Sequence, residues 1–138
     1  GAALVPAAGA DGAHVGQDAD ARAVRDLLGA GRVLGVSVAT PAQARAAAAA
    51  GADYLGVTVW ATATKPEAEP VGLEGLAAVA ASTDLPVVGI GGIDAGNAAS
   101  VVAAGAAGVA VVSAVAAATD PVAAARELLD AVRAVVRA

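Results

Sequence analysis

The stretch AAGADYLGV, residues 49 to 57, contains the pattern that decides the fold class. Its alanines are typical of a helix end, Gly51 of a tight turn, and the residues from Tyr54 onward of an apolar strand. Residues 7–15 (AAGADGAHV) and residues 103–111 (AAGAAGVAV) repeat the same pattern. A helix end, a turn and an apolar strand that recur in this order indicate parallel βα units.

Further helices and strands are predicted between these three stretches. We expect strands at about Gly12–Val15, Val33–Val38, Tyr54–Trp60, Leu85–Ile90 and Gly108–Ser113. We expect helices at Ala2–Ala8, Ala21–Leu28, Pro41–Ala50, Leu73–Ser82 and Ala95–Ala104, and one that begins after Pro121. The fold class is therefore α/β, with about five βα units in a single domain over residues 1–138. This alternation fits a doubly wound sheet and a barrel equally well.

Composition limits the partners and the location of the protein. The formal net charge is -5 and the arginines are scattered, so no basic stripe for nucleic acid is present. The absence of cysteine excludes disulfides and is compatible with the cytoplasm. Residues 98–118 carry no charge, but Gly105, Gly108 and a β-branched second half favour a helix end and a buried strand over a membrane span. We expect a cytoplasmic protein without nucleic-acid or membrane partners.

The loop GIGGIDAGN, residues 89–97, is a candidate phosphate site because it follows a predicted parallel strand. Gly91 and Gly92 would let backbone N–H groups approach a ligand closely, and Asp94 would cap the next helix. A tight turn that needs glycine explains the same residues equally well. Ser113, predicted at the end of the following strand, would add a hydroxyl beside the glycines, as in the phosphate sites of barrels.

Polar side chains at other strand ends leave several roles open. Asp18 could hold Mg²⁺, which prefers oxygen ligands, or cap the helix that begins near Ala21, a role that we assign to Asp20. His14 is the only histidine, and a base and a hydrogen-bonded structural residue are both compatible with its place in an apolar strand. Ser37 stands at a strand end and could orient a ligand.

The loop WATATKP, residues 60–66, holds the only tryptophan and the only lysine of the chain. Lys65 lies beside two hydroxyl residues, Thr62 and Thr64, just after a predicted strand. An exposed lysine that only solvates the fold is the simplest interpretation. Trp60 is better explained as a wall of a site or as part of the core than as a stacking platform.

Taken together, the loops resemble the thiamine phosphate synthase family along essentially the whole chain. The similar motifs, in order, are GADGAHVGQD, VLGVSVAT, GADYLGV, WATATKP, VGLEGLAAVA, LPVVGIGGI and GVAVVSA. The resemblance implies a TIM-type (β/α)8 barrel, here incomplete with about five βα units. It also implies a transferase that joins hydroxymethylpyrimidine diphosphate to a thiazole phosphate and releases pyrophosphate.

The resemblance further implies roles for individual residues and a Mg²⁺ cofactor. Lys65 and Ser37 would be the catalytic residues, with Lys65 in contact with the leaving diphosphate and Ser37 lining the centre of the site. Asp18 would approach Mg²⁺. The residues implied to bind phosphorylated substrates are Gln17, Thr62, Thr64, Lys65, Gly91, Gly92, Val112 and Ser113.

Departures from the family pattern leave other functions open. A basic strand end and an Asn-Asp pair that precede these motifs in the family are absent, and the loop with Asp18 is one residue short. A thiazole tautomerase of the same superfamily and a noncatalytic fragment that binds phosphorylated ligands are the alternatives. Because an incomplete barrel would have open strand edges, we also expect self-association or marginal stability.

Overall fold

The structure is a computed structural model that describes residues 4–62 and 69–136. Its strands are β1 (Gly12–Val15), β2 (Val33–Ser37), β3 (Tyr54–Thr58), β4 (Val87–Ile90) and β5 (Gly108–Ala110). Its helices are α1 (Leu4–Ala7), α2 (Ala21–Leu28), α3 (Pro41–Ala49), α4 (Gly72–Ala80), α5 (Ala98–Ala103), α6 (Ser113–Ala116) and α7 (Pro121–Val136). Strands and helices alternate from α1 to β5 as the sequence predicts, and two helices, α6 and α7, follow β5.

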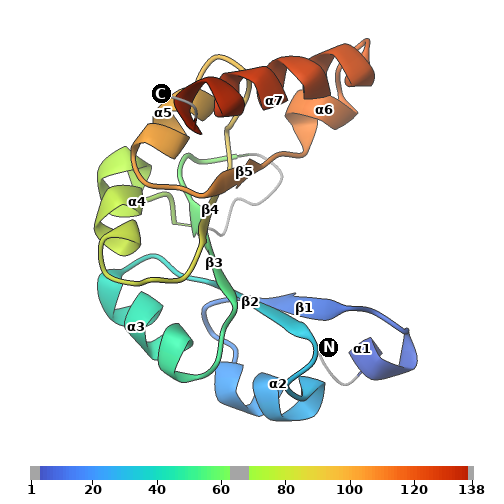
Figure 1. Ribbon diagram of the computed structural model, residues 1–138, viewed down its shortest axis with the longest axis vertical. Coiled ribbons are helices and arrows are strands. Elements are labelled where there is room, and N and C mark those ends of the chain that lie inside the picture. The colour runs from blue at the N-terminus through green and yellow to red at the C-terminus, as the bar shows by residue number, and fades with distance from the viewer. Residues whose placement is uncertain (1–3, 63–68, 137–138) are drawn as a thin grey trace.

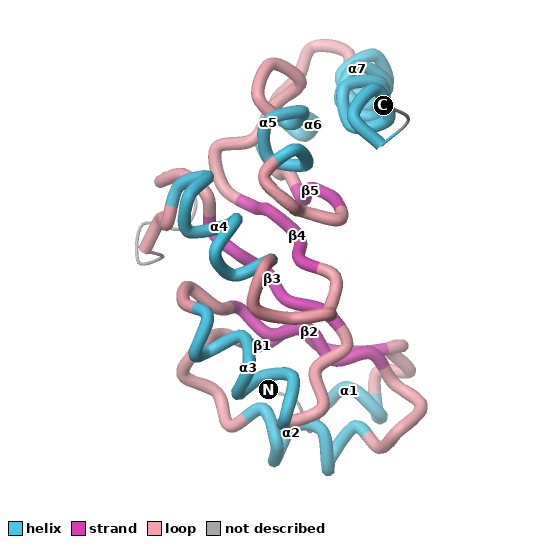
Figure 2. Tube along the Cα trace, turned by 60° about the vertical axis from the view of Figure 1, so that its left-hand side comes forward, coloured by secondary structure: helices cyan, strands magenta, loops and turns pink. Residues whose placement is uncertain are grey.

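The strands form one sheet in the order β1-β2-β3-β4-β5, and every neighbouring pair is parallel. The pairing of β3 with β4 sets Leu55 opposite Val87 in parallel register, which confirms that strands adjacent in sequence are neighbours in the sheet. Figure 2 shows the strands following one another through a single twisted sheet. Consecutive parallel strands with intervening helices are the α/β arrangement that was predicted.

The sheet curves into a crescent, with strands along the concave side and helices along the convex side (Figure 1). In β2, Leu34 and Val36 are buried under the helices, whereas Gly35 and Ser37 alternate with them and belong to the concave face. We call this concave side the inner face. The arrangement is an open arc of a TIM-type barrel.

A single cluster of small apolar side chains packs between the sheet and the helices. Its fully buried members include Leu34, Leu55, Val57, Leu76 and Val101. Side chains of this size let the helices approach the sheet closely, which suits a chain without phenylalanine or methionine. No helix within the described ranges is long and apolar enough to cross a membrane.

Local signals explain where the helices nearest the site begin. The Asp20 carboxylate accepts a hydrogen bond from the N–H of Ala23 at 3.0 Å, so Asp20 is the N-cap of α2, as predicted. Thr40 and Gln43 form a capping box at the start of α3. These caps fix the path of the chain immediately after β1 and β2.

Two predictions at the C-terminal ends of strands are wrong in detail. Strand β5 ends at Ala110, and Ser113 instead begins the short helix α6, where the N–H of Ala116 donates to the Val112 carbonyl at 2.8 Å. Helix α5 begins at Ala98, and its N-cap is Asn97 rather than Asp94. The other predicted segments differ from the observed ones by at most two residues at either end.

The loop before α5 explains the second error. The Asp94 carboxylate accepts a hydrogen bond from the N–H of Gly96 at 2.8 Å, so it closes a turn before the helix starts. The side chain of Asn97 spans the loop, since its Oδ1 accepts from the N–H of Asp94 at 3.0 Å and its Nδ2 donates to the carbonyl of Gly92 at 2.9 Å. Asn97 therefore ties α5 to the glycine turn.

Candidate functional site

A pocket of about 490 Å³ lies at the C-terminal ends of β3, β4 and β5. Loops from three consecutive parallel strands converge there, which is where ligands bind in barrels and open α/β sheets. It brings together five residues that the sequence singled out: Thr62, Gly91, Gly92, Val112 and Ser113. We call it the β4–β5 pocket.

Two consecutive glycines shape the floor of this pocket. Gly91 and Gly92 have φ values of 92° and 65°, a region that favours glycine. A Cβ on Gly91 would lie 2.6 Å from the carbonyl oxygen of Trp60, and one on Gly92 would lie 2.9 Å from the Cβ of Trp60. Glycine is therefore required here by the approach of Trp60, whether or not a ligand binds.

The same turn exposes backbone donors to the pocket. Among the described residues, the N–H groups of Gly91 and Gly92 have no acceptor, whereas the Gly91 carbonyl accepts from the N–H of Trp60 at 3.3 Å. Free N–H groups in a glycine turn at the end of a parallel strand can hold an anion. A tight turn that needs glycine and a site that binds an anion are the two interpretations of this loop. Both are compatible with the backbone conformation that the loop adopts.

A second group of polar residues lies on the inner face, and sequence reasoning did not connect its members. His14 in β1 contacts Tyr54 in β3 and Ser37 at the end of β2. The distances are 2.9 Å from Nδ1 to the Tyr54 hydroxyl and 2.9 Å from Nε2 to the Ser37 hydroxyl. His14 is exposed at the inner face, so it is a hydrogen-bonded residue that remains accessible.

Two glycines make room for this group. The imidazole of His14 and the phenol ring of Tyr54 lie over Gly35, and a Cβ on that residue would clash with both rings. A Cβ on Gly56 would lie 2.9 Å from the Cε1 atom of His14. The strand register supplies the signal that was missed, because Gly35 is paired with His14 on one side and with Tyr54 on the other.

The loop after β1 supplies one carboxylate for a cation. Asp18 is exposed in a turn that the N–H of Ala19 closes on the carbonyl of Gly16 at 3.1 Å. Asp20 is committed to the cap of α2. The described ranges contain no group of three His, Cys, Asp or Glu residues that could hold a metal ion. Among the described residues, Asp18 is then the candidate ligand for Mg²⁺. The other ligands of the ion would have to come from substrate, water or other residues.

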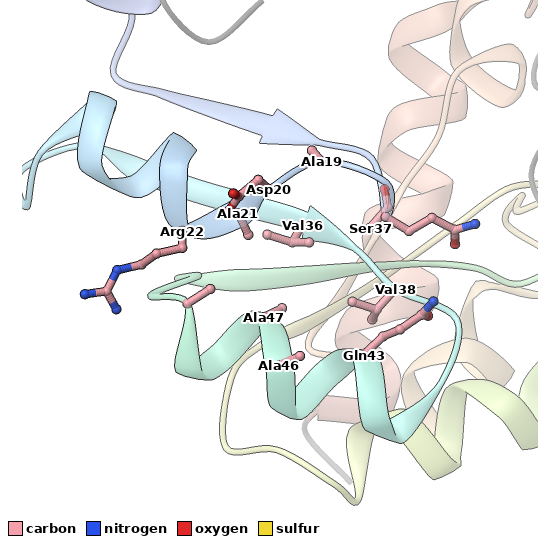
Figure 3. A pocket seen from close by; sticks show the side chains of 12 residues that line it. Ala19, Asp20, Ala21, Arg22, Val36, Ser37, Val38, Gln43, Ala46 and Ala47 are labelled. Carbon is pink, nitrogen blue, oxygen red and sulfur yellow. The ribbon is translucent and has the colours of Figure 1, made fainter.

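A smaller pocket of about 280 Å³ lies between α2 and α3, and Gln17 and Ser37 are among the residues that line it. Figure 3 shows that most of the other lining side chains, such as Ala46 and Ala47, are small and apolar, and that Arg22 points away into solvent. The guanidinium of Arg22 is therefore turned away from this pocket, although Arg22 belongs to its lining.

The shorter of the two ion pairs among the described residues lies at the opposite end of the sheet. Arg25 donates to the carboxylate of Asp53 at 2.6 Å and to the carbonyls of Gly29, Arg32 and Gly51. The backbone N–H of Leu34 chiefly, and Arg25 in addition, hold the pKa of Asp53 below its ordinary value of 3.8, although burial opposes the shift. Because Asp53 precedes β3, this contact stabilises the fold and does not belong to the site.

Two predicted residues, Thr64 and Lys65, fall outside the described residues. Thr62 is the last residue described before them, and it lines the β4–β5 pocket. The structure therefore places the start of the WATATKP loop at the pocket and leaves the role of Lys65 a prediction.

Comparison with known proteins finds the same family along most of the chain. The family described as thiamine monophosphate synthase matches residues 2–115. A thiamine-phosphate synthase of Moorella thermoacetica is 54% identical over 126 residues, which cover 89% of this chain and 60% of the relative. The chain thus spans about three fifths of the length of that relative.

Solved structures show the same fold. A thiamine phosphate pyrophosphorylase from Pyrococcus furiosus is similar with a TM-score of 0.86 and 36% identity, over 98% of this chain and 65% of that one. A 3-hexulose-6-phosphate synthase from Salmonella typhimurium, at 23% identity, shares the fold with a TM-score of 0.76 over 97% of this chain and 67% of that one.

Proposed function

The chain belongs to the thiamine monophosphate synthase family, and we propose that it acts as a thiamine phosphate synthase-like transferase. The reaction would join hydroxymethylpyrimidine diphosphate to a thiazole phosphate and release pyrophosphate. The observation that carries the proposal is the β4–β5 pocket, which gathers five of the residues that the sequence motifs single out. We further propose that residues 1–138 act as one domain, in the cytoplasm.

In this proposal the β4–β5 pocket binds the phosphate of the thiazole substrate. The N–H groups of Gly91 and Gly92 and the hydroxyl of Ser113 would donate to the phosphate oxygens, with Thr62 at the rim. These donors are neutral, so they would hold the phosphate while leaving no strong charge to bind the competing diphosphate. Val112 is exposed at the mouth and would contact the apolar part of the ligand.

The diphosphate would lie towards the Lys65 and Asp18 loops. The bond between the pyrimidine methylene carbon and the diphosphate oxygen would break with its electron pair on oxygen, and the thiazole nitrogen would then donate its lone pair to that carbon. Lys65 would stabilise the charge on the departing oxygen. Asp18 would hold Mg²⁺, whose contribution when bound is to neutralise part of the diphosphate charge. A single protein carboxylate fits this arrangement, because Mg²⁺ often takes its other ligands from substrate phosphates and water.

Ser37 and His14 would position the pyrimidine ring rather than react with it. Their hydroxyl and imidazole are held side by side on the inner face by the 2.9 Å hydrogen bond. A polar pair on an otherwise apolar strand surface can fix the orientation of a heteroaromatic ring. No side chain in this arrangement acts as a nucleophile.

Thiazole tautomerase is the second candidate, and His14 is the observation that favours it. The imidazole is exposed at the inner face, and its contacts with Tyr54 and Ser37 would orient it. It could move a proton on a bound thiazole if one of these partners gave way to the ligand. This chemistry would use the β4–β5 pocket for the same phosphate and would need neither Lys65 nor a diphosphate.

One chromatographic assay separates these candidates. The protein, alone and together with the part of the M. thermoacetica relative that has no counterpart in this chain, is supplied with both substrates and Mg²⁺. Formation of thiamine phosphate supports the synthase, and conversion of one thiazole isomer to another without it supports the tautomerase. Binding of thiazole phosphate in calorimetry with neither product would assign a noncatalytic phosphate-ligand-binding role.

A further inference from the structure

The turn between β4 and α5 contains three consecutive backbone N–H groups without an acceptor among the described residues. They belong to Gly91, Gly92 and Ile93, and all three residues line the β4–β5 pocket. Ile93 differs from the two glycines, because its side chain belongs to the core and the residue is only 5% exposed. A backbone donor this close to the core is normally paired, so water or a ligand in the pocket must supply its partner.

Two hydrogen bonds fix the directions of these N–H groups. The described peptide bonds are trans, so each carbonyl and the N–H that follows it point in opposite directions. The Gly91 carbonyl accepts from the N–H of Trp60 at 3.3 Å, so the N–H of Gly92 points away from Trp60. The Gly92 carbonyl accepts from Nδ2 of Asn97 at 2.9 Å, so the N–H of Ile93 points away from that side chain. The first contact is made by backbone alone, whereas the second depends on a side chain.

The amide of Asn97 suits this contact because it carries a donor and an acceptor in one short planar group. While its Nδ2 donates to the Gly92 carbonyl, its Oδ1 accepts from the N–H of Asp94 at 3.0 Å. An aspartate here could accept but could not donate. A serine has a single oxygen on a shorter side chain, so it would lose at least one of the two contacts.

The same side chain does not cap its own helix. Asparagine is a preferred N-cap residue, yet no hydrogen bond joins the Asn97 side chain to the first turn of α5. The helix starts instead through backbone contacts, in which the N–H of Ala98 donates to the Asp94 carbonyl at 2.9 Å. Ala98 and Val101 then hold α5 in the core, where both are 0% exposed. The side chain of Asn97 is therefore directed at the glycine turn and is not needed to start the helix.

We propose that Asn97 is a positioning residue for phosphate binding, which holds the Gly92–Ile93 peptide so that the N–H of Ile93 joins those of Gly91 and Gly92 as a donor to the phosphate. The inference rests on the proposed function, in which the β4–β5 pocket binds the phosphate of the thiazole substrate. The terminal oxygens of a phosphate accept several hydrogen bonds, so one phosphate can satisfy neighbouring N–H groups. Asn97 does not line the pocket, so it acts through the backbone.

A purely structural role is the competing interpretation of Asn97. In that case its hydrogen bonds would only stabilise the loop, and their loss would lower the free energy of unfolding without changing the affinity of the pocket for phosphate. The N–H of Ile93 would then also not respond to a phosphate ligand. Both differences can be measured.

An NMR titration of the unmodified chain tests the N–H of Ile93 as a donor. Thiazole phosphate is added to ¹⁵N-labelled protein, with inorganic phosphate as a second probe, and the backbone amide signals of Gly91, Gly92 and Ile93 are followed. We expect all three amide protons to move downfield, because hydrogen bonds to a charged acceptor are short and strong.

Asn97→Ser tests whether the side chain positions that donor. Serine is also a preferred N-cap residue, so α5 can start as before, but the donor to the Gly92 carbonyl is lost. We expect calorimetry to show about tenfold weaker binding of thiazole phosphate, since a donor to a charged group is misplaced. The downfield shift of the Ile93 amide proton should become much smaller in this variant.

Gln43→Ser is the matched control. Gln43 is another side-chain amide that holds a loop between a strand and a helix, since its Oε1 accepts from the N–H groups of Ala39 and Thr40 at 2.7 and 3.2 Å. It lies at the start of α3 and does not line the β4–β5 pocket. We expect this variant to be less stable in thermal unfolding and to bind thiazole phosphate with unchanged affinity.

Three results would overturn the inference and leave the proposed function in place. They are downfield shifts of Gly91 and Gly92 without a shift of Ile93, unchanged affinity in Asn97→Ser, and an equal loss of affinity in Gln43→Ser. If no amide of the turn shifts at millimolar thiazole phosphate, the pocket assignment in the proposed function fails, and the inference fails with it. If Asn97→Ser does not fold, the titration of the unmodified chain decides.

Discussion

His14 and Ser37, which stand 23 residues apart in the sequence, are joined by a hydrogen bond of 2.9 Å between Nε2 and Oγ across two neighbouring strands. The other imidazole nitrogen contacts the Tyr54 hydroxyl, and the two rings lie 5.4 Å apart between centroids. Three strands thus contribute one residue each to a polar cluster on the inner face. The cluster runs from the first residue of β3 to the last residue of β2.

Removing the Ser37 hydroxyl should change the environment of His14. Because the sequence has one histidine, a ¹⁵N-labelled sample gives one pair of ring-nitrogen signals. We expect Ser37→Ala to shift the Nε2 signal and Tyr54→Phe to shift the Nδ1 signal. Ser82→Ala is the control, since that hydroxyl donates to the Val79 carbonyl at the end of α4. Unchanged ring signals in both cluster variants would contradict the observed contacts.

Adding a methyl group at Gly35 should disrupt the same cluster. A Cβ there would clash with the rings of His14 and Tyr54, which must then move apart. We expect Gly35→Ala to lower the free energy of unfolding by about 1–3 kcal/mol, the usual cost of overpacking. Gly31→Ala is the matched control, because a Cβ on Gly31 would meet nothing within 4 Å. Thermal unfolding measures the stability of both variants. Equal midpoint temperatures of Gly35→Ala and Gly31→Ala would refute the prediction.

Lys65→Ala should lower the rate of thiamine phosphate formation by about a hundredfold, the usual scale for the loss of one electrostatic contact in a transition state. Binding of thiazole phosphate should be affected much less, because other residues hold it. Arg45→Ala, on the exposed face of α3, is the control for loss of a positive charge. The measurement uses a preparation that turns over both substrates. Unchanged turnover would make Lys65 an exposed residue that only solvates the fold.

Ser113→Ala should weaken thiazole phosphate binding by about 10- to 100-fold, because a hydrogen bond to a charged group contributes about 1.5–3 kcal/mol. Calorimetry measures the affinity for thiazole phosphate. Ser100→Ala is the control, because Ser100 is an exposed serine on α5. Substitution of Gly92 by a larger residue should abolish binding, but it also pushes against Trp60. Ser113 is therefore the cleaner probe, and equal affinities in its variant and the control would count against the pocket assignment.

Asp53 should make stability depend on pH in the acid range. Its pKa is lowered in the folded state, so its contribution is complete above the ordinary value of 3.8 and is lost as the pH falls through the folded pKa. We expect Asp53→Asn to reduce the free energy of unfolding at pH 7 by about 0.5 kcal/mol, allowing for solvent screening of this half-exposed side chain. The difference should shrink as the pH falls below 3.8 and vanish once the Asp53 carboxylate is protonated in the folded state.

Asp26→Asn is the matched control for that experiment. Its partner Arg22 lies 3.7 Å away, and both side chains are largely exposed. Exposed pairs of this kind contribute little, so denaturant titrations should show almost no effect of this substitution at any pH. If Asp53→Asn lowers the free energy of unfolding by the same amount at every pH, the charge of Asp53 is not the source of its contribution to stability.

The sequence by itself determined the order and type of the elements, because apolar strands, glycine turns and helix caps are local signals. It also singled out Gly91, Gly92 and Ser113, since loops after parallel strands meet at one edge whatever the details of packing. The tertiary structure alone decided that His14, Ser37 and Tyr54 touch, because a contact across three strands depends on the register and on the space above Gly35 and Gly56. It also decided that Asp94 closes a turn and that α5 starts after Asn97, whose side chain bonds back to Asp94 and Gly92 instead of capping the helix, since only the path of the backbone distinguishes these roles.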